Sequence, residues 1–236
     1  MRIAHREDAR EQAFVQAFGL AWGGEVVLSA EAPLVAEIGA PGVSIPVDLS
    51  GLSPWTPCAK EASQTERVVL LGPESAGKTW LSRELAQTFC VPFVPEYLRI
   101  WVDHRGLPVT LSDAHAAARG QIASEFATRS LGPRALICDT DLWMNVVYAR
   151  RYFGTCPDWI EQAACAQLPA LTLVLTPEVE WTPDPQRGLP DESARWEIFE
   201  AVCSVLREAN RPFTVVRGGW EQRRFAAHEH VKALQS

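Results

Sequence analysis

The segment Gly72–Thr79, GPESAGKT, restricts the fold of this chain more than any other part of the sequence. It fits the pattern G-x-x-x-x-G-K-[ST] at every fixed position. The apolar run RVVLL before it predicts a buried strand, and the sequence from Lys78 predicts a helix. A glycine-rich turn between a strand and a helix points backbone N–H groups inward, where the helix dipole also attracts phosphate. These flanks disfavour a chance glycine-rich turn and predict a P-loop.

The P-loop residues predict binding of ATP with Mg²⁺. Lys78 is expected to bridge the β- and γ-phosphates, and the Thr79 hydroxyl to bind the metal. We expect the nucleotide to contact the whole loop and the residue after it: Gly72, Pro73, Glu74, Ser75, Ala76, Gly77, Lys78, Thr79 and Trp80. The P-loop alone does not identify the reaction, because many activities share it.

Downstream of residue 65, short β-branched runs alternate with helical stretches, which is typical of an α/β fold. We predict strands at 67–71, 91–94, 135–138, 171–175 and 213–216, and helices at 78–89, 112–130, 141–150, 158–167, 192–210 and from 220. The pattern predicts a P-loop NTPase fold similar to nucleoside kinases, with a five-stranded parallel sheet flanked by helices. We assign residues 66–236 to this kinase domain.

The first 65 residues form a separate, weakly patterned segment. The proline-containing stretch SGLSPWTPCAKEASQTE marks the boundary. Before it we predict a helix at 6–18, a strand at 25–28 and a short helical piece at 33–38.

The segment ALICDTD, 135–141, predicts a buried strand that ends in acid. Asp139 is expected to follow a strand beside the P-loop strand and to bind Mg²⁺ together with Thr79. Asp141 has two open interpretations: it caps the next helix, or it faces the acceptor substrate.

The segment VPFVPEYLR, 91–99, predicts a strand that presents Glu96, Tyr97 and Arg99 at the ligand edge of the sheet. Phosphoryl transfer to a hydroxyl needs a carboxylate that orients the nucleophile and takes its proton. Glu96 is the leading candidate for this role, with Asp139 and Asp141 as competitors. The alternative is a surface glutamate in the first turn of a helix, where the dipole favours it.

The segment WTPDPQRGLPDESAR, 181–195, combines proline, glycine and charge after a predicted strand, as a closing lid does. Arg187 is expected to neutralise charge on the transferring phosphoryl group. The alternative is an exposed arginine without a role. Arg195, Arg150 and Arg151 remain ambiguous, because basic residues are common in such positions on helices.

The net charge of −7 excludes a protein held on nucleic acid by a broad basic face. The charged N-terminus MRIAHREDAR and the absence of a long apolar run predict a cytoplasmic protein without membrane contact. Six scattered cysteines without a C-x-x-C pair predict reduced, mostly buried thiols and no zinc site.

The chain resembles the ribosylnicotinamide kinase domain of bifunctional NAD-biosynthesis proteins, a P-loop AAA-type ATPase/kinase domain that follows an NMN adenylyltransferase domain. The resemblance covers nearly all of residues 67–220 and is carried by these motifs in order: GPESAGKT, VPEYLR, ARGQIASE at 118–125, CDTD, YFGTCPDW at 152–159 and TPDPQRGLP.

The resemblance implies transfer of the ATP γ-phosphate to the 5′-hydroxyl of nicotinamide riboside, giving NMN. A cationic pyridinium substrate suits an aromatic face, and Tyr97, Trp101 and Phe126 are candidates. Core packing is the alternative for these rings, and Pro95 stands where some relatives have an aromatic residue.

Residues 26–48 are similar to the end of the adenylyltransferase domain, but the His-x-Gly-His signature is absent. We interpret residues 1–65 as a degenerate remnant for packing or for a homo-oligomer, with chance likeness as the alternative.

Two rival functions stay open. Another P-loop kinase that acts on nucleosides or other small molecules would use the same carboxylate and lid arginine. A non-catalytic ATP-binding regulatory module would need only the loop, and the accompanying Glu96, Asp139 and Arg187 disfavour it.

Overall fold

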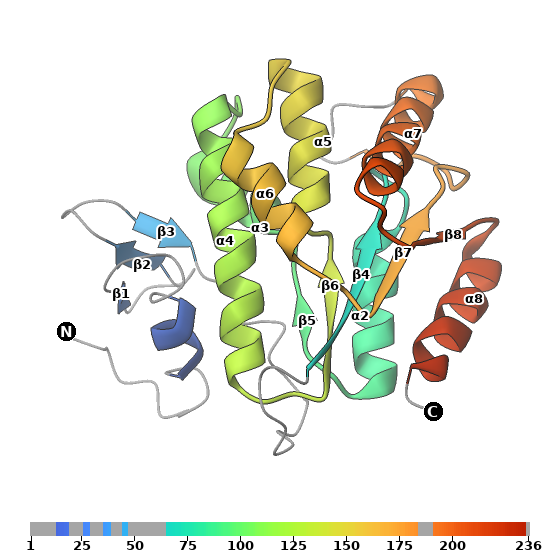
Figure 1. Ribbon diagram of the computed structural model, residues 1–236, viewed down its shortest axis with the longest axis horizontal. Helices are drawn as coiled ribbons and strands as arrows, with labels where there is room; N and C mark the ends of the chain where they lie inside the picture. Colours follow the sequence, from blue (N-terminus) through green and yellow to red (C-terminus); the bar gives the residue numbers. More distant parts are fainter. Residues whose placement is uncertain are drawn as a thin grey trace.

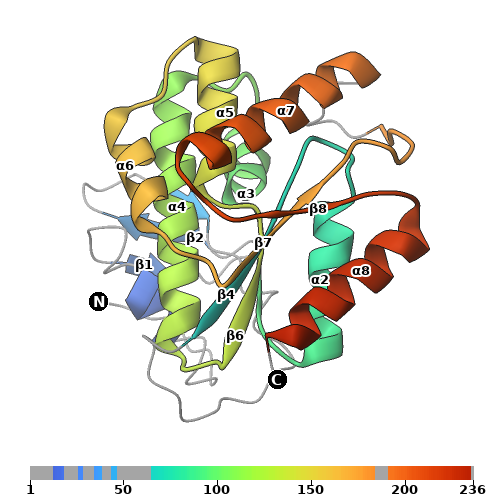
Figure 2. The same cartoon turned by 45° about the vertical axis from the view of Figure 1, so that its right-hand side comes forward.

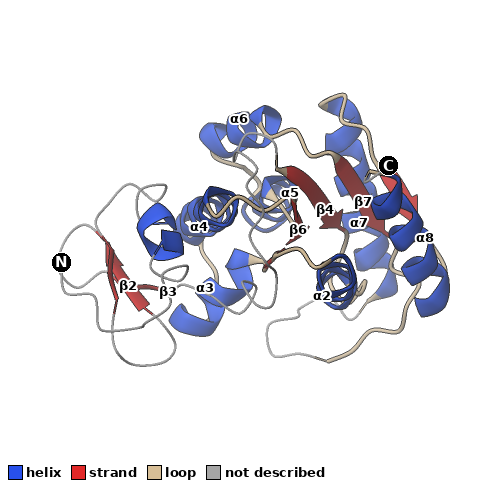
Figure 3. Ribbon diagram, turned by 90° about the horizontal axis from the view of Figure 1, so that it is seen from below, coloured by secondary structure: helices blue, strands red, loops and turns tan. Residues whose placement is uncertain are grey.

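The computed structural model describes residues 13–18, 26–28, 35–38, 44–46, 65–183 and 191–234 (Figure 1). A five-stranded sheet with helices on both faces makes up most of the molecule. A smaller three-stranded antiparallel sheet lies to one side, next to α3 and α4 (Figure 3).

The main sheet has the order β5-β6-β4-β7-β8 and is parallel throughout. Its strands are β4 (Glu66–Leu71), β5 (Phe93–Val94), β6 (Ala135–Asp139), β7 (Leu171–Leu175) and β8 (Thr214–Val216). The P-loop strand β4 is central and pairs with β6 on one side and β7 on the other. All five carboxyl ends therefore lie at one edge of the sheet, where ligands of such folds bind.

Alternate residues of β4 enter two separate hydrophobic cores. Val69 and Leu71 pack on one face, under α4 (Leu111–Ser130), α5 (Leu142–Phe153), α6 (Asp158–Ala166) and α7 (Glu192–Glu208). Val68 and Leu70 pack on the other face, under α2 (Lys78–Phe89) and α8 (Trp220–Ala233). Figure 2 shows α2 and α8 side by side on that face. Burial on both faces explains why the strand sequences are continuously apolar.

The structure confirms the predicted five-stranded parallel α/β fold and adds one helix to it that was not among those predicted. Helix α3 (Tyr97–Arg105) follows the end of β5 after two intervening residues, at a place where we considered a helix only as the alternative interpretation of Glu96. Its short length and the mixed sequence YLRIWVDHR gave no clear helical period.

The described parts of the N-terminal segment differ from the prediction. β1 (Val26–Leu28) agrees with the predicted strand, but the helical piece predicted at 33–38 is wrong. Residues Val35–Ile38 form β2, which pairs with β1 and with β3 (Ser44–Pro46). Pairing with two neighbours outweighs the weak local preference of VAEI. Of the predicted helix at 6–18, residues 13–18 are helical and residues 6–12 lie outside the described residues.

Candidate active site

The P-loop adopts the tight turn that its glycines predict. Gly72 has φ 140°, and a Cβ there would lie 2.6 Å from the Leu175 carbonyl oxygen. Gly77 has φ 85°, and a Cβ there would collide with the Trp220 ring. Lys78 is buried, and its Nζ donates hydrogen bonds to the carbonyls of Gly72 and Pro73 at 2.9 Å each. The lysine is thus held directly over the loop that would carry the phosphates.

Thr79 and Asp139 meet across the β4–β6 pair. The Thr79 hydroxyl donates a hydrogen bond of 2.5 Å to Asp139 Oδ2. Asp139 ends β6 opposite Leu70, and its Oδ1 is buried without a hydrogen-bond partner among the described residues. Burial raises the pKa of Asp139, while the Lys78 charge lowers it. A hydroxyl and a buried carboxylate with one unused oxygen fit the oxygen donors that Mg²⁺ requires.

The segment CDTD sends its two carboxylates to different places. Thr140, between them, has φ 80°, a left-handed conformation that is costly for a β-branched residue. Asp139 thereby faces the P-loop. Asp141 instead caps α5, where its Oδ1 accepts a hydrogen bond from the Trp143 N–H at 2.8 Å.

A cavity of about 900 Å³ opens beside the P-loop. Residues 74–79 form its floor, and the walls come from α2, α3, α4, α5, the loop 107–109 and the start of α8. Lys78, Thr79, Glu96 and Arg99 all line it, so segments far apart in the sequence converge as predicted.

Glu96 projects into this cavity from the residue before α3. It is the N-cap of that helix, but its side chain makes no capping hydrogen bond. Burial of its carboxyl group raises its pKa, the Lys78 charge lowers it, and the Asp139 charge raises it again. The carboxylate is therefore close to both phosphate-side groups and is not used to stabilise the helix. Glu96 therefore lines the same cavity as the P-loop residues.

Two predicted substrate-binding residues do not reach the cavity. Tyr97 is fully buried, and its ring packs 6.1 Å from the Phe18 ring, because α3 turns this side chain toward α4 and the N-terminal helix. Asp141 is buried at the start of α5, so the capping interpretation is the correct one. The predictions that Tyr97 and Asp141 contact substrate are wrong.

The other candidate rings also lie outside the cavity wall. The Trp101 indole N–H donates a hydrogen bond to Asp113 at 2.9 Å, and Phe126 is half-exposed on α4. The wall is instead formed by Tyr148 and Tyr152, whose rings stack with centroids 5.9 Å apart, together with Asn145. These three residues were missed, although their i, i+3, i+7 spacing after CDTD places them on one face of a helix.

Carboxylates lie near both members of this tyrosine pair, and Arg151 lies near Tyr152. Burial raises the pKa of Tyr148 well above its ordinary value, and the charges of Glu96 and Glu74 raise it further. Burial also raises the pKa of Tyr152, again with a contribution from Glu74. Neutral aromatic rings near two carboxylates can bind a cation.

Two tryptophans line the cavity beside the P-loop. Trp80 on α2 and Trp220 at the start of α8 both line the cavity and are about half exposed. Their rings meet edge to face at 5.4 Å between centroids. The predicted contact of Trp80 with the nucleotide fits this position, which offers a planar apolar surface.

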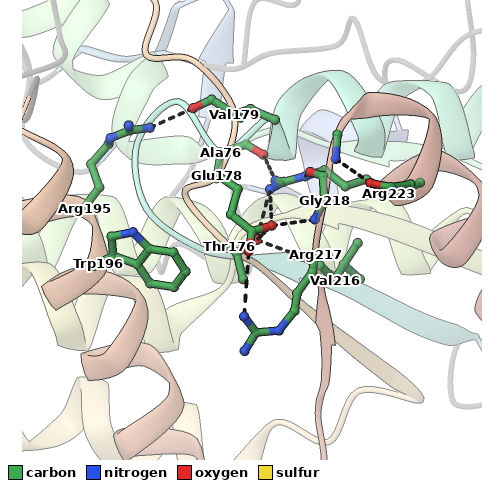
Figure 4. Close-up of polar contacts among 12 residues, drawn as sticks. Ala76, Thr176, Glu178, Val179, Arg195, Trp196, Val216, Arg217, Gly218 and Arg223 are labelled. Atoms are coloured by element: carbon green, nitrogen blue, oxygen red, sulfur yellow. Dashed lines mark hydrogen bonds and ion pairs between the residues drawn. The ribbon is translucent and has the colours of Figure 1, made fainter.

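A buried arginine anchors α8 to the P-loop (Figure 4). Arg223 donates hydrogen bonds to the carbonyl oxygens of Gly218 and Ala76, at 2.6 and 2.9 Å, and to the Thr176 hydroxyl at 3.0 Å. Glu178 accepts hydrogen bonds from the Gly218 N–H and the Thr176 hydroxyl. Sequence reasoning did not find this cluster, because its members come from four separate segments.

Three of the arginines that the sequence left ambiguous have partners in the structure. Arg195 is buried and donates to the Val179 carbonyl at 3.1 Å (Figure 4). Arg150 and Arg151 form surface ion pairs with Glu161 and Glu197. Arg187 lies outside the described residues, as does the rest of 184–190.

The cysteines agree with the expectation of mostly buried thiols. Among the described residues, Cys138, Cys156 and Cys203 are buried, Cys90 and Cys165 are exposed, and these five are free, while Cys58 lies outside the described residues. Within the described ranges, no group of three His, Cys, Asp or Glu side chains could hold a metal ion. The helices of the same ranges include none that is both long enough and apolar enough to cross a bilayer.

Solved structures with a similar fold are nucleotide-binding proteins and kinases. The NadR protein in complex with NR is 23% identical, with a TM-score of 0.64 over 73% of this chain and 52% of that chain. The NadR protein in complex with NAD and AMP-PNP is also 23% identical, with a TM-score of 0.60 over 73% and 50%. This chain therefore spans about half the length of those NadR chains.

Thymidylate kinases share the fold over nearly their whole length. The enzyme from Candida albicans is 11% identical, with a TM-score of 0.56 over 73% of this chain and 93% of that chain. The enzyme from Ehrlichia chaffeensis is 16% identical, with a TM-score of 0.52 over 72% and 98%. Identities this low show a common fold alone.

No curated protein sequence matches the chain significantly. The family described as AAA domain matches residues 67–223. The match begins in the P-loop strand, includes Asp139 and ends at Arg223, the arginine that anchors α8 to the loop. Since it covers more than half of the sequence and every described part of the site, the chain belongs to the AAA domain family.

Proposed function

We propose that this protein is an ATP-dependent kinase that transfers the γ-phosphate to the 5′-hydroxyl of nicotinamide riboside, forming NMN. The observation that carries the proposal is the convergence of Lys78, Thr79 and Glu96 on one cavity, with Asp139 hydrogen-bonded to Thr79. A binding module would need the loop but not a carboxylate that lines the same cavity from the residue before α3. The fold that this chain shares with thymidylate kinases supports phosphoryl transfer as the reaction class.

The residues divide the reaction between them. Lys78 leaves its two loop carbonyls and neutralises charge on the β- and γ-phosphates. Glu96 orients the acceptor hydroxyl and takes its proton as the new O–P bond forms and the bond to ADP breaks. Thr79 and Asp139 would hold Mg²⁺, which supplies charge neutralisation between the phosphates when bound. Arg187 is proposed to close over the transferring group.

The acceptor wall supports a cationic riboside. Stacked Tyr148 and Tyr152 offer π faces, while Glu74 and Glu96 supply negative charge near them. A pyridinium ring gains from both, whereas a neutral nucleobase gains only from stacking. The NR bound by a NadR structure of the same fold agrees with this choice. Arg99 of α3 lines the same cavity, and we propose that it contacts the acceptor.

The nucleotide end is proposed to bind ATP between the P-loop and the Trp80–Trp220 pair. The AMP-PNP in the second NadR structure agrees with an adenosine nucleotide. We further propose that the protein is cytoplasmic, and that residues 1–65 are a degenerate adenylyltransferase remnant that packs on the kinase domain or joins it in a homo-oligomer.

A panel of acceptors tests the proposal. ADP formation from ATP·Mg²⁺ is measured with nicotinamide riboside, thymidine, deoxyadenosine and no acceptor. We expect nicotinamide riboside to give the highest kcat/KM, because only it carries a cationic ring. A deoxynucleoside that is turned over equally well or better would remove the substrate assignment. Nucleotide binding without any acceptor-dependent ADP formation would favour a regulatory module.

A further inference from the structure

Part of α4 is polar and buried although it does not line the cavity. The stretch ARGQIASE at 118–125 carries Gln121 and Glu125, which are 1% and 4% exposed. Buried polar groups destabilise a protein unless they are hydrogen-bonded, so their partners show what they are for. Those partners lead to α3, which begins directly after Glu96, and to the start of α5, which carries the tyrosine pair.

Gln121 connects α4 to the start of α3. Its Oε1 accepts a hydrogen bond from the Tyr97 N–H at 3.1 Å, and its Nε2 donates to Glu125 Oε1 at 3.1 Å. The first N–H groups of a helix lack partners within the helix, and a side chain commonly supplies one. Gln121 does so here in place of the N-cap residue Glu96, whose side chain remains directed to the cavity.

Arg67 connects the same network to α5. Its Nε lies 2.7 Å from Glu125 Oε2, and its Nη2 lies 3.2 Å from Asp141 Oδ2. Asp141 in turn caps α5, the helix that carries Tyr148 and Tyr152. Burial is the largest single effect and lowers the pKa of Arg67, but the contributions of Glu125, Cys138 and Asp141 together outweigh it and raise that pKa, so the guanidinium stays ionised.

We propose that Arg67, Gln121, Glu125 and Asp141 form a positioning network that fixes Glu96 on α3 relative to the aromatic wall of α5. None of the four lines the cavity, so they act through the elements that they hold. The proposal rests on the proposed function for the role of Glu96. The role of ARGQIASE would then be to set the distance between Glu96, the proposed proton acceptor, and the tyrosine rings of α5 that would bind the substrate.

Packing alone does not account for these residues. Replacing a buried ion pair by apolar side chains of similar volume is often neutral for stability or even stabilising. An apolar α4 would cover the sheet equally well, but it would remove the bond from the Tyr97 N–H to Gln121 that ties the start of α3 to α4. A displacement of about 1 Å at a reacting group can lower a rate about 100-fold.

Gln121→Met tests the network, with Thr128→Val as the matched control. Thr128 is equally buried on the same helix, but its hydroxyl donates only to the Ser124 carbonyl of α4 itself. We expect Gln121→Met to lower kcat for nicotinamide riboside by about 10- to 100-fold. The dissociation constant for AMP-PNP·Mg²⁺ should stay within about twofold, and Thr128→Val should change neither quantity.

Amide exchange tests the same contact without a substrate. The chain has three tyrosines, so ¹⁵N-tyrosine labelling reports Tyr97 beside Tyr148 and Tyr152 as internal references. We expect the Tyr97 amide to exchange at least about tenfold faster in Gln121→Met and to be unchanged in Thr128→Val, because only the first variant removes its acceptor.

The swapped variant Gln121→Glu/Glu125→Gln should restore most of the turnover and slow Tyr97 exchange, because it keeps an acceptor for Tyr97, one carboxylate and one amide. If Gln121→Met does not fold, Gln121→Ala, which removes the same acceptor, replaces it in the same comparison. An inactive unmodified protein would refute the proposed function while the exchange measurement still decides the network. Equal kcat and equal Tyr97 exchange in Gln121→Met and Thr128→Val would overturn the network.

Discussion

Glu96, the proposed proton acceptor, lowers the stability of the fold when it is ionised. Its carboxyl group is withdrawn from bulk water, which raises its pKa and disfavours the ionised form. A folded-state pKa above the unfolded value means that the folded protein binds the proton more tightly. The ionised carboxylate therefore lowers the stability of the folded protein above that pKa, and this loss disappears as the pH falls through it.

Glu96→Gln should separate function from stability. We expect turnover to fall at least about 100-fold because no group takes the acceptor proton, while AMP-PNP·Mg²⁺ affinity changes little. At neutral pH the ligand-free variant should melt at a higher temperature than the unmodified protein. The difference should shrink as the pH falls, since protonated Glu96 resembles glutamine. Near-normal turnover would show that another group accepts the proton.

The phosphate-side residues should behave differently from Glu96. Lys78→Met and Asp139→Asn each remove a charge beside the phosphates and should slow transfer by about 100- to 1000-fold, or about 3 to 4 kcal/mol. In Asp139→Asn the concentration of Mg²⁺ needed for half-maximal rate should also rise, because Asp139 supplies the buried oxygen. Mg²⁺ titration of both variants checks this, and an unchanged Mg²⁺ requirement for Asp139→Asn would remove the metal assignment.

At the scale of elements, Arg223 links α8, the P-loop and the end of β7 through three hydrogen bonds (Figure 4). Arg223→Met should lower the free energy of unfolding by about 2 to 3 kcal/mol. Because α8 also carries Trp220, ATP affinity should fall as well. Denaturant unfolding and nucleotide titration measure the two effects, with exposed Arg224→Met as the control. Unchanged ATP affinity in a destabilised Arg223→Met would show that α8 does not support the nucleotide site.

The contact between α3 and α4 depends on a residue without a side chain. A Cβ at Gly120 would overlap the buried Tyr97 ring. Gly120→Ala should therefore lower the free energy of unfolding by about 1 to 3 kcal/mol through overpacking, despite the better helix propensity of alanine. Gly219→Ala, where φ is −76° and a Cβ would meet nothing within 4 Å, controls for general effects of glycine replacement. A Gly120→Ala protein as stable as the unmodified one would show that α3 and α4 do not pack this closely.

Across the whole molecule, the features that could be predicted from the sequence are those that depend on local patterns. β-branched runs gave the five strands within a few residues, and the P-loop gave the position of the phosphate site. Thr79 and Asp139 could be paired in advance because parallel strands end at one edge. The acceptor wall could not be predicted, since α3 is short and the direction of Tyr97 is set by Phe18 and Gly120 from other segments. Long-range contacts of this kind leave no local pattern.

Product identification tests the central claim most directly. The protein is incubated with ATP, Mg²⁺ and nicotinamide riboside, and the products are followed by ³¹P NMR and mass spectrometry. We predict one new phosphomonoester on the 5′-oxygen, identical with NMN, formed in equal amount with ADP and at least about 100-fold more slowly in Glu96→Gln. ADP released together with inorganic phosphate, and no NMN, would contradict it.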